Sequence, residues 1–329
     1  MRAAVLYDVD DIRIEDRPVP ELNDGDILVR TQASGICSGD VMGWYIKKKA
    51  PLVLGHEPSG IVESVRGETT FAPGDRVFVH HHAPCFECRA CRREDFVQCA
   101  TWRASRIEPG GIAQYFRVPP GNQRDTLRLP DAVPFEDAAL TEPLACVVKS
   151  LRRGGVQRGD RIYIIGLGVM GQLHALAARD MGADVYASDF VEYRCELAAR
   201  NGANAFHPDD AGRVLGDGAD VVICGPGTNA ALQSACAAAA GGGAVVMFTP
   251  FPPEMAISLD PTKFYFGDLR LVGSYSCGPQ DTREALKLIE RRVVTAQKVG
   301  AERVHLEDVP QAYRDLAQGR IVKPIVRFD

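Results

Sequence analysis

The sequence lacks any apolar run long enough to cross a membrane, and it lacks a surplus of basic residues. No stretch approaches the roughly 20 apolar residues that a bilayer span needs. The N-terminal MRAAVLYDVDDIRIED has no apolar core of a secretory signal. The 38 basic side chains face 43 acidic ones, for a net charge of −5, which argues against a nucleic-acid partner. We therefore expect neither a membrane nor a nucleic acid as partner, and a cytoplasmic location.

The 329 residues are too many for one comfortable hydrophobic core, so two domains are expected. Short β-like runs, separated by Gly, Pro and Asp, fill residues 1 to about 140. From about 143 to 276, strands alternate with helices, which predicts a parallel sheet. Within this part, the alanine- and glycine-rich 230–243 predicts a helix and a turn. The tail predicts helices over 281–292 and 308–317 and a last strand, KPIVRF.

A glycine-rich turn, YIIGLGVMG, lies between a β-like run and an apolar helix. Gly166 makes the turn, Gly168 lets the backbone approach a pyrophosphate, and Gly171 lets the helix pack closely on the strand. With Val169 and Met170 between them, these residues predict a dinucleotide site at a helix N-terminus. A tight turn in a cofactor-free α/β domain is the plainer alternative.

The next strand supports the dinucleotide interpretation because it ends in an acid. Asp189 follows Gly171 by 18 residues, where a carboxylate can accept hydrogen bonds from both ribose hydroxyls and repel a 2′-phosphate. This favours NAD over NADP. Arg194 is five residues further and can lie along the adenosine. A helix-capping role for Asp189 is the alternative.

Four cysteines follow the spacing C-x2-C-x2-C-x7-C, at Cys85, Cys88, Cys91 and Cys99. Thiols stay reduced in the cytoplasm, and disulfides between cysteines three apart are strained. The spacing favours a structural zinc with a closed shell of four thiolates. An iron–sulfur cluster and a nucleic-acid-binding zinc ribbon are alternatives, and the acidic balance of the chain argues against the ribbon.

A second, mixed set of possible ligands is spread over three short motifs. GICSGD contains Cys37 and Asp40, GHEPSG contains His56 and Glu57, and TEPLAC contains Glu142. Each residue alone is weak evidence, because a lone Cys is usually a small core residue. Together they offer the S, N and O ligands of a catalytic zinc, which keeps one position open.

These motifs, GHE, the four cysteines, GDRV, EPLA and GLGVMG, resemble the zinc-dependent medium-chain dehydrogenases over essentially the whole chain. GIC and EPLACVVKSL look closest to the sorbitol (polyol) and threonine dehydrogenase branch. The resemblance implies an α/β protein with a GroES-like β-rich catalytic domain and a Rossmann doubly wound parallel sheet. It implies that residues 1–143 form the catalytic domain, with a structural-zinc lobe at about 84–100. Residues 144–277 are then the NAD-binding domain, and residues 278–329 return to the catalytic domain.

Carried onto this sequence, the resemblance implies that Cys37 and His56 bind the catalytic zinc. Glu57 binds the zinc or lies just behind it, and Glu142 is at the third-ligand position or touches the metal through water. Asp40 is expected behind the ligands. Asp189 and Arg194 match the D-x4-R pattern of this branch at the adenosine end. Two zinc ions per chain and NAD are the implied cofactors.

Two departures concern the substrate. Relatives carry a hydroxyl and often a histidine as a proton relay where this chain has Gly39 and Met42, which leaves Ser38 as a substitute hydroxyl. Polyol dehydrogenases carry a substrate-binding Arg where this chain offers Ser276. The three histidines 80–82 are either ordinary polar residues at a strand end or part of the lining of the substrate cleft.

The resemblance therefore implies an NAD- and zinc-dependent oxidoreductase that transfers a hydride between NAD and a small alcohol or its ketone. A polyol, a cyclitol, a diol and threonine, as in L-threonine 3-dehydrogenase, all stay open as substrates. A non-catalytic binding protein on the same scaffold and a zinc-independent quinone or enoyl reductase are the alternatives. A homodimer or homotetramer is expected, with RLVGSYS as a candidate edge strand.

Overall fold

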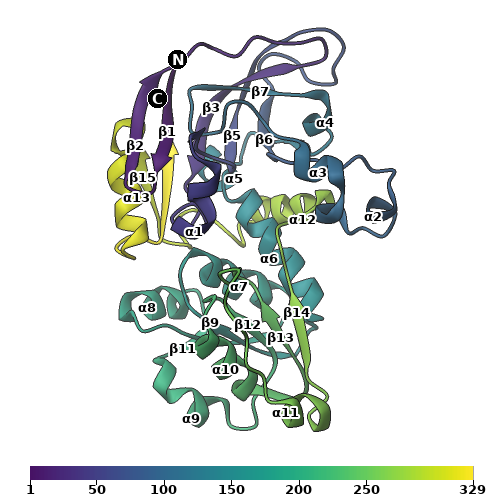
Figure 1. Cartoon of the computed structure of the whole chain (residues 1–329), viewed down its shortest axis with the longest axis vertical. Coiled ribbons are helices and arrows are strands. Elements are labelled where there is room, and N and C mark those ends of the chain that lie inside the picture. Colours follow the sequence, from purple (N-terminus) through teal and green to yellow (C-terminus); the bar gives the residue numbers. More distant parts are fainter. Residues whose placement is uncertain (329) are drawn as a thin grey trace. The chain divides into compact units, whose positions relative to one another are not determined.

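The computed structural model describes residues 1–328, and its contacts divide the chain into two compact units. The first unit combines Met1–Ala145 with the C-terminal segment that begins at Cys277, and the second is Cys146–Ser276. Both ends of the chain thus belong to one unit, and the other is inserted between them (Figure 1). The helix α6, Thr141–Gly154, contains the boundary.

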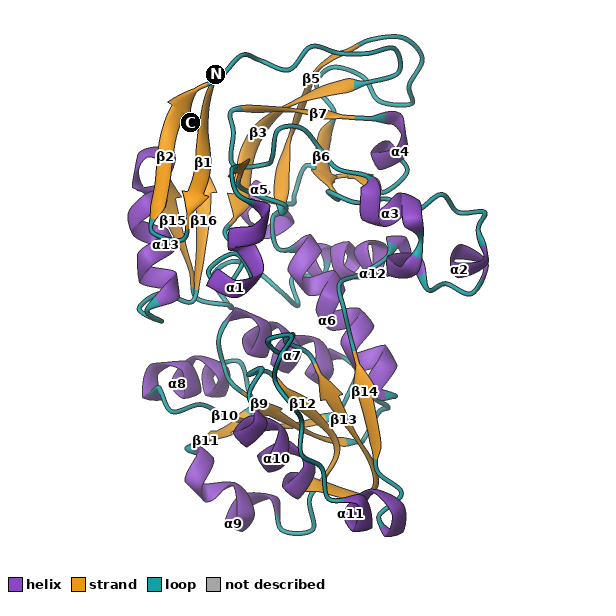
Figure 2. Cartoon of the chain, viewed as in Figure 1, coloured by secondary structure: helices purple, strands orange, loops and turns teal. Residues whose placement is uncertain are grey.

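The first unit is mainly β-structure, in two sheets (Figure 2). A small antiparallel sheet has the order β2-β1-β4, and a larger one has the order β15-β16-β3-β5-β6-β8, with β7 paired to β3. The strands are β1 Arg2–Asp8, β2 Asp11–Asp16, β3 Ile27–Gly35, β4 Leu52–Val53, β5 Pro58–Val65, β6 Arg76–Val79, β7 Tyr115–Val118, β8 Thr126–Arg128, β15 Ala301–His305 and β16 Lys323–Arg327. These strands confirm the β-rich first part that the short β-like runs of the sequence predict.

Two apolar clusters hold this unit together. One lies among β3, β5, β6 and β7 and includes Val29, Val77 and Phe116, all fully buried. The other packs Leu6 and Tyr313 between the N-terminal strands and α13. The helices are α1 Gly43–Ile46, α2 Arg89–Arg92, α3 Ala100–Ala104, α4 Pro120–Gln123, α5 Phe135–Ala138, α12 Pro279–Glu290 and α13 Val309–Ala317.

The second unit is a six-stranded parallel sheet flanked by helices (Figure 2). Its order, β11-β10-β9-β12-β13-β14, is the doubly wound order of dinucleotide-binding domains, with the switch point between β9 and β12. The strands are β9 Arg161–Ile165, β10 Asp184–Ser188, β11 Asn204–Phe206, β12 Ala219–Cys224, β13 Ala239–Met247 and β14 Arg270–Gly273. The helices are α7 Val169–Asp180, α8 Glu192–Arg200, α9 Ala211–Leu215, α10 Asn229–Ala238 and α11 Pro261–Phe266.

One local expectation is wrong. The sequence predicts a helix and a turn over 230–243, but the helix α10 ends at Ala238 and residues 239–243 already belong to the strand β13. Ala239 pairs with Ala219, and the register then shifts before Ala244 pairs with Val221. Between these two pairs the glycine-rich residues form an irregular, bulged stretch in which Gly242 has φ +77°, so the glycines keep their turn-like conformation although the stretch belongs to β13.

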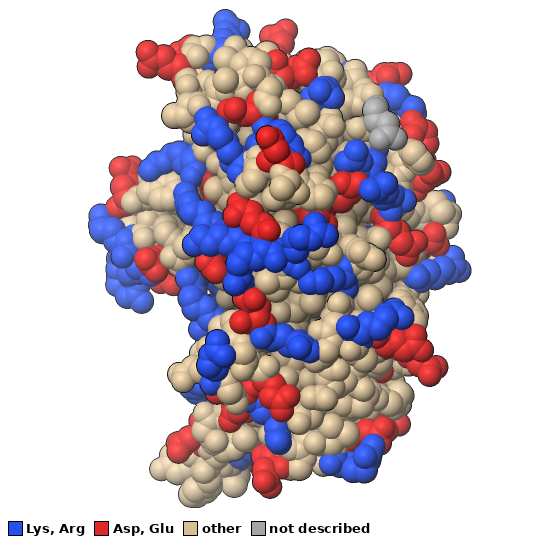
Figure 3. Space-filling model, turned by 180° about the vertical axis from the view of Figure 1, so that it is seen from behind, with Lys and Arg blue, Asp and Glu red and all other residues tan. Residues whose placement is uncertain are grey.

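The surface carries both signs of charge. Figure 3 shows acidic and basic side chains interspersed over the face that it draws. Within residues 1–328, no helix combines the length and the apolar character that a membrane crossing requires.

A buried ion pair ties the C-terminal strand into the first unit. Lys323, the first residue of β16, is fully buried and donates a hydrogen bond to Glu57 and another, of 3.0 Å, to the carbonyl oxygen of Ile36. Glu57 is fully buried as well, directly before β5. The ion pair fits only because residue 35 is a glycine. A Cβ at Gly35 would lie 1.8 Å from Glu57 Oε2 and 2.8 Å from Lys323 Nζ.

We expect the Lys323→Met substitution to lower the free energy of unfolding of the first unit by about 3–5 kcal/mol, because it leaves the Glu57 carboxylate buried without its partner. The double variant Glu57→Gln/Lys323→Met should recover most of this loss, because it removes both charges. Urea denaturation followed by circular dichroism measures both.

Lys47→Met is the matched control, because Lys47 forms an exposed ion pair with Asp8 at 2.9 Å. It should change the stability by no more than about 1 kcal/mol. Equal stability of Lys323→Met and the control would contradict the importance of the buried pair.

Candidate functional site

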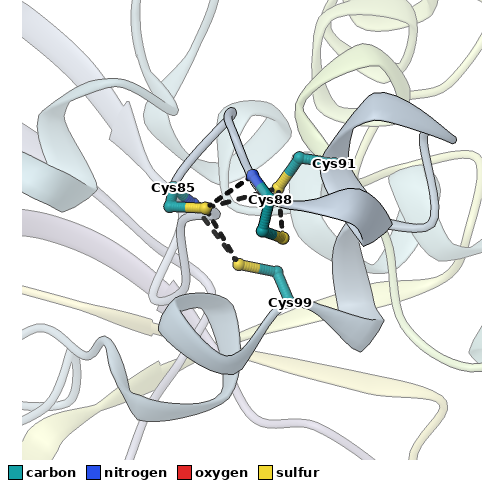
Figure 4. A group of neighbouring side chains, drawn as sticks. All are labelled: Cys85, Cys88, Cys91 and Cys99. Carbon is teal, nitrogen blue, oxygen red and sulfur yellow. Dashed lines mark hydrogen bonds between the residues drawn. The ribbon is translucent and has the colours of Figure 1, made fainter.

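The four cysteines of the 85–99 segment converge on one point (Figure 4). Cys88 Sγ lies 3.5 Å from Cys91 Sγ, and Cys85 Sγ lies 3.8 Å from Cys91 Sγ and 3.6 Å from Cys99 Sγ. A disulfide would need about 2.05 Å, whereas four thiolates around one zinc, each bonded at about 2.3 Å, lie about 3.8 Å apart. The spacing and the sulfur geometry therefore both fit a four-thiolate metal site.

The thiols of this group have unequal proton affinities. Burial and, to a smaller extent, hydrogen bonds with the neighbouring thiols together raise the pKa of Cys91 to about 12. Burial also acts to raise the pKa of Cys99, but the backbone amides of Cys85 and Trp102 and the adjacent thiols outweigh it and lower this pKa to about 6. Four thiolates cannot share so small a space without a cation, so the group needs a divalent ion to be fully deprotonated.

A second donor group lies at the ends of β3 and β4. Cys37 follows β3, His56 follows β4, and Glu57 precedes β5, and one ligand atom of each lies within 4.8 Å of the others. The glycine before His56, Gly55, has φ +98°, and a Cβ there would lie 2.4 Å from the backbone nitrogen of Ile112. The turn that presents His56 therefore requires glycine.

The two carboxylate oxygens of Glu57 have different surroundings. Oε2 faces Lys323, whereas Oε1 is buried and has no hydrogen-bond partner within residues 1–328. Leaving a buried carboxylate oxygen unpartnered is costly. A metal ion held with Cys37 and His56 would satisfy it, so the donor set fits a zinc ion.

Asp40 lies on the other side of His56. Its Oδ2 is 3.6 Å from His56 Nδ1, and its backbone oxygen accepts a hydrogen bond from Tyr313. A carboxylate behind the second nitrogen of a metal-binding histidine is a recurrent support of such sites. Burial raises the pKa of the Asp40 carboxyl, and the charge of His56 opposes that shift.

Glu142, the second residue of α6, groups with two histidines rather than with Cys37. One of its oxygens lies within 4.8 Å of a ring nitrogen of His80 and of His81. The His81 ring in turn lies 5.0 Å from that of His56, centroid to centroid. Burial raises the pKa of Glu142, and His56 opposes the shift, so the carboxyl is electrostatically coupled to the first donor group.

His80 is fixed from both sides. Its Nδ1 lies 2.6 Å from Asp125 Oδ2, and Thr282 donates a 2.7 Å hydrogen bond to the other oxygen of that carboxylate. Its Nε2 lies 3.6 Å from Cys277 Sγ. All four side chains are fully buried.

The relay positions carry no polar side chain next to the thiol. Gly39 lies beside Cys37, and a Cβ at Gly39 would lie 3.4 Å from the sulfur and 3.8 Å from the terminal methyl group of Met42. Ser38 is half-buried and directly follows Cys37. The apolar surroundings at Gly39 and Met42 match the departure noted in the sequence.

In the second unit, the glycine loop has the form that a pyrophosphate site requires. Gly166 has φ +90°, and a Cβ at Gly171 would lie 2.0 Å from the carbonyl oxygen of Gly166, so only glycine fits there. Gly168 caps α7 with open space around it, and Val169 and Met170 form the first turn of that helix. The free N–H groups of this helix end suit an anion.

Asp189 organises the neighbouring turn. Its two oxygens accept hydrogen bonds from the backbone nitrogens of Leu167, at 2.7 Å, and Val191, at 2.9 Å. Arg194 Nη1 lies 3.6 Å from Asp189 Oδ2. A carboxylate oxygen can accept more than one hydrogen bond, so ribose hydroxyls remain possible partners.

A cavity of about 500 Å³ in the second unit begins beside this turn. Ile165, Phe190, Pro226 and Thr228 line it, together with apolar residues of α9 and α10. These residues follow the carboxyl ends of β9, β10 and β12, where doubly wound sheets bind nucleotides, so the cavity suits the flat, mostly apolar faces of an adenine ring.

Sequence reasoning missed Lys323 and Asp125. Lys323 begins the strand KPIVRF, and a charged residue inside such an apolar run indicates a buried partner, because burying an isolated charge is costly. Asp125 had no comparable signal, since it lies in a polar segment, GNQRDT, that predicts a turn.

Comparisons with known proteins agree with this geometry. Residues 23–131 match the family described as alcohol dehydrogenase GroES-like domain, and residues 169–291 match zinc-binding dehydrogenase. The chain is 30% identical to Probable D-xylulose reductase A of Aspergillus terreus, over 98% of this chain and 96% of the relative. It is 29% identical to D-xylulose reductase A of Aspergillus oryzae, over 98% and 95%.

Two solved structures are similar over nearly their full length. Alcohol dehydrogenase TADH from Thermus sp. ATN1 has a TM-score of 0.90 with 25% identity, and covers 100% of each chain. A zinc-binding dehydrogenase from Sinorhizobium meliloti 1021, bound to NADP, has a TM-score of 0.89 with 27% identity, over 99% of each chain. The chain therefore belongs to the zinc-dependent medium-chain dehydrogenase family, on its polyol dehydrogenase branch.

Proposed function

We propose that this protein transfers a hydride between NAD and a primary or secondary alcohol that carries further hydroxyl groups, with one catalytic and one structural zinc per chain. The single observation that carries the proposal is the donor group of Cys37, His56 and Glu57. In this group the buried Oε1 of Glu57 has no hydrogen-bond partner within residues 1–328. Thiolate, imidazole and carboxylate are three ligands, and they leave one position of a tetrahedral ion open.

We infer that Glu57 rather than Glu142 is the third ligand. Glu57 is the carboxylate that groups with Cys37 and His56, and Lys323 holds it in place from behind. Glu142 groups with His80 and His81 instead. We place Glu142 beside the open position, where it and His81 can hold the reacting alcohol through hydrogen bonds.

When bound, zinc would supply Lewis-acid chemistry that lowers the pKa of a coordinating alcohol. The chain itself supplies orientation. Asp40 holds the ring of His56, and Lys323 holds Glu57. With Gly39 and Met42 at the relay positions, the proton of the alcohol leaves through water, Ser38 or Glu142.

NAD rather than NADP fits the second unit, although one of the similar structures holds NADP. The Asp189 carboxylate, fixed by two backbone amides, faces the position of the adenosine ribose in such folds. Arg194 is held by that same carboxylate, so its charge is already compensated and is a poor partner for a 2′-phosphate.

Two other functions are less well supported. A dehydrogenase for threonine would need a partner for the amino and carboxylate groups of that substrate, and the donor groups offer histidines and carboxylates only. A non-catalytic binding protein has no use for a three-ligand set with an open position, which the chain retains in full.

We further infer a cytoplasmic homodimer or homotetramer. None of the ten cysteines forms a disulfide, as suits a reducing compartment. The strand β14 is the last in its sheet, and Tyr265 and Phe266 of the neighbouring α11 are 78% and 80% exposed. An unpaired sheet edge beside exposed aromatic residues favours association with a second copy.

Native mass spectrometry should find two zinc ions per chain. We expect Cys37→Ser/His56→Ala to lose one ion and at least about 1,000-fold in kcat/KM, because the Lewis acid is removed, with little change in stability. Cys85→Ser/Cys99→Ser should lose the other ion and lower the melting temperature, because that ion closes the 85–99 segment.

Cys195→Ser is the control, since this half-buried thiol lies outside both donor groups, and it should keep both ions. One ion in the wild type, held only by the cysteines of the 85–99 segment, would disprove the catalytic centre.

Cofactor choice tests the role of Asp189. The wild type should have a higher kcat/KM for NAD than for NADP, and Asp189→Asn should reduce that ratio at least about tenfold, because the substitution keeps the shape and removes the charge that repels a 2′-phosphate. Asp184→Asn, on the exposed end of the same strand, should leave the ratio unchanged. An NADP preference in the wild type would refute the assignment.

Light scattering after size exclusion should give the mass of two or four chains. Tyr265→Ser/Phe266→Ser, which removes the exposed apolar rings of α11, should shift the population toward smaller species, because burial of such rings favours association. A monomeric wild type at micromolar concentration would contradict the inferred assembly.

A further inference from the structure

Three consecutive histidines, 80 to 82, directly follow the strand β6. Neither the zinc ligands nor the dinucleotide site accounts for them. Their hydrogen bonds differ, and the difference separates the three roles.

The outer two histidines are anchored by the protein itself. Both nitrogens of His80 face partners, Asp125 at 2.6 Å and Cys277 at 3.6 Å. His82 Nδ1 lies 2.5 Å from the carbonyl oxygen of Ser105, and its ring packs on Trp102 at 4.2 Å, centroid to centroid. These two rings serve the packing around them.

His81 differs, because its Nδ1 is buried and lacks a hydrogen-bond partner among residues 1–328. Its backbone is nevertheless fixed, since Asn122 Nδ2 donates a 2.8 Å hydrogen bond to its carbonyl oxygen. A buried ring nitrogen without a partner costs stability unless something satisfies it.

The surroundings of His81 are those of the reaction centre. Its ring is 5.0 Å from that of His56, and a ring nitrogen is within 4.8 Å of a Glu142 oxygen. An imidazole ring offers a nitrogen on each side, and a neutral ring can donate a hydrogen bond from one nitrogen and accept one at the other.

A second metal ion held by His80, His81 and Glu142 is disfavoured. Both nitrogens of His80 already face Asp125 and Cys277, which leaves only two donors for such an ion. A structural zinc takes four protein ligands and a catalytic zinc three.

We propose that His81 recognises the substrate, by a hydrogen bond to a second hydroxyl on the carbon next to the reacting one, so that the enzyme selects vicinal diols and polyols over simple alcohols. This inference rests on the proposed function, since it needs the alcohol to bind at the metal beside His56. A site with an unpaired buried polar group discriminates strongly against an analogue that lacks the matching hydroxyl.

Kinetics with 2,3-butanediol and 2-butanol, which differ by one hydroxyl, test the proposal. The wild type should prefer the diol at least about 100-fold in kcat/KM. His81→Phe should reduce this preference at least about tenfold, through loss of diol turnover with turnover of 2-butanol kept, because phenylalanine fills the same space without a polar atom. His82→Phe is the matched control and should keep the preference.

Two further measurements do not depend on activity. Zinc content should stay at the wild-type value in His81→Phe, and loss of one ion would show instead that His81 is a ligand, which overturns the proposal. In the zinc-loaded wild type, the ring ¹⁵N resonances of His81 should shift on addition of 2,3-butanediol and not of 2-butanol.

The outcomes separate the two proposals. If the wild type oxidises no alcohol with NAD or NADP, the proposed function fails, whatever His81 does. If it oxidises alcohols but His81→Phe leaves the diol preference unchanged, or the ¹⁵N resonances respond equally to both alcohols, the role of His81 fails alone. Should His81→Phe not fold, His81→Asn, which keeps a polar group, allows the same comparison and should retain an intermediate preference.

Discussion

The buried contact between Glu57 and Lys323 is the constraint on which the metal centre depends. It joins residues 266 positions apart and holds one carboxylate oxygen so that the other, Oε1, is left without a partner within residues 1–328. Two buried charges are not a net gain in stability over apolar residues of the same size, so packing alone does not explain the pair. A metal position does, because a carboxylate that must bind a cation needs a fixed orientation and a charged form. The return of the C-terminal segment to the first unit, through β16, is what brings the lysine there.

The three neighbouring histidines show the same contrast between paired and unpaired polar atoms. His80 and His82 use their nitrogens on Asp125, Cys277 and Ser105, and His81 keeps one nitrogen unpaired. In this group, the side chains that are satisfied by the protein position their neighbours, whereas the open atoms of Glu57 and His81 are the ones that we assign to ligands. Pairing most of the polar atoms and leaving a few open gives a site that is rigid before its ligands arrive, which reduces the entropy lost on binding.

Local patterns predicted much of this structure, and long-range contacts account for what was missed. The glycine loop at 166–171, the cysteine spacing at 85–99 and the alternation of strands and helices are each encoded within a few neighbouring residues, and all are present. The strand β15 was not expected, because AERVH has a charged, exposed pattern, and it exists through pairing with β16. The assignment of residues 239–243 to a strand was missed because their glycines favour a turn, and they join β13 through an irregular stretch in which Gly242 has φ +77°. The donor groups followed from motifs, but the choice between Glu57 and Glu142, and among the three histidines, depends on partners such as Lys323 and Asp125 that lie far away in the sequence.

The departures from the family pattern form one consistent set when they are considered together. Gly39 and Met42 remove polar groups from the side of Cys37, and Ser276 replaces the arginine that binds hydroxyls in similar polyol dehydrogenases. Two imidazoles and a carboxylate, His80, His81 and Glu142, gather beside His56 instead. A neutral imidazole binds a hydroxyl without the charge that a guanidinium brings, and a charged donor is the better partner for phosphate or carboxylate. For the function proposed above, this donor set predicts uncharged polyols rather than sugar phosphates or hydroxy acids as substrates, because it places no cationic guanidinium beside the alcohol.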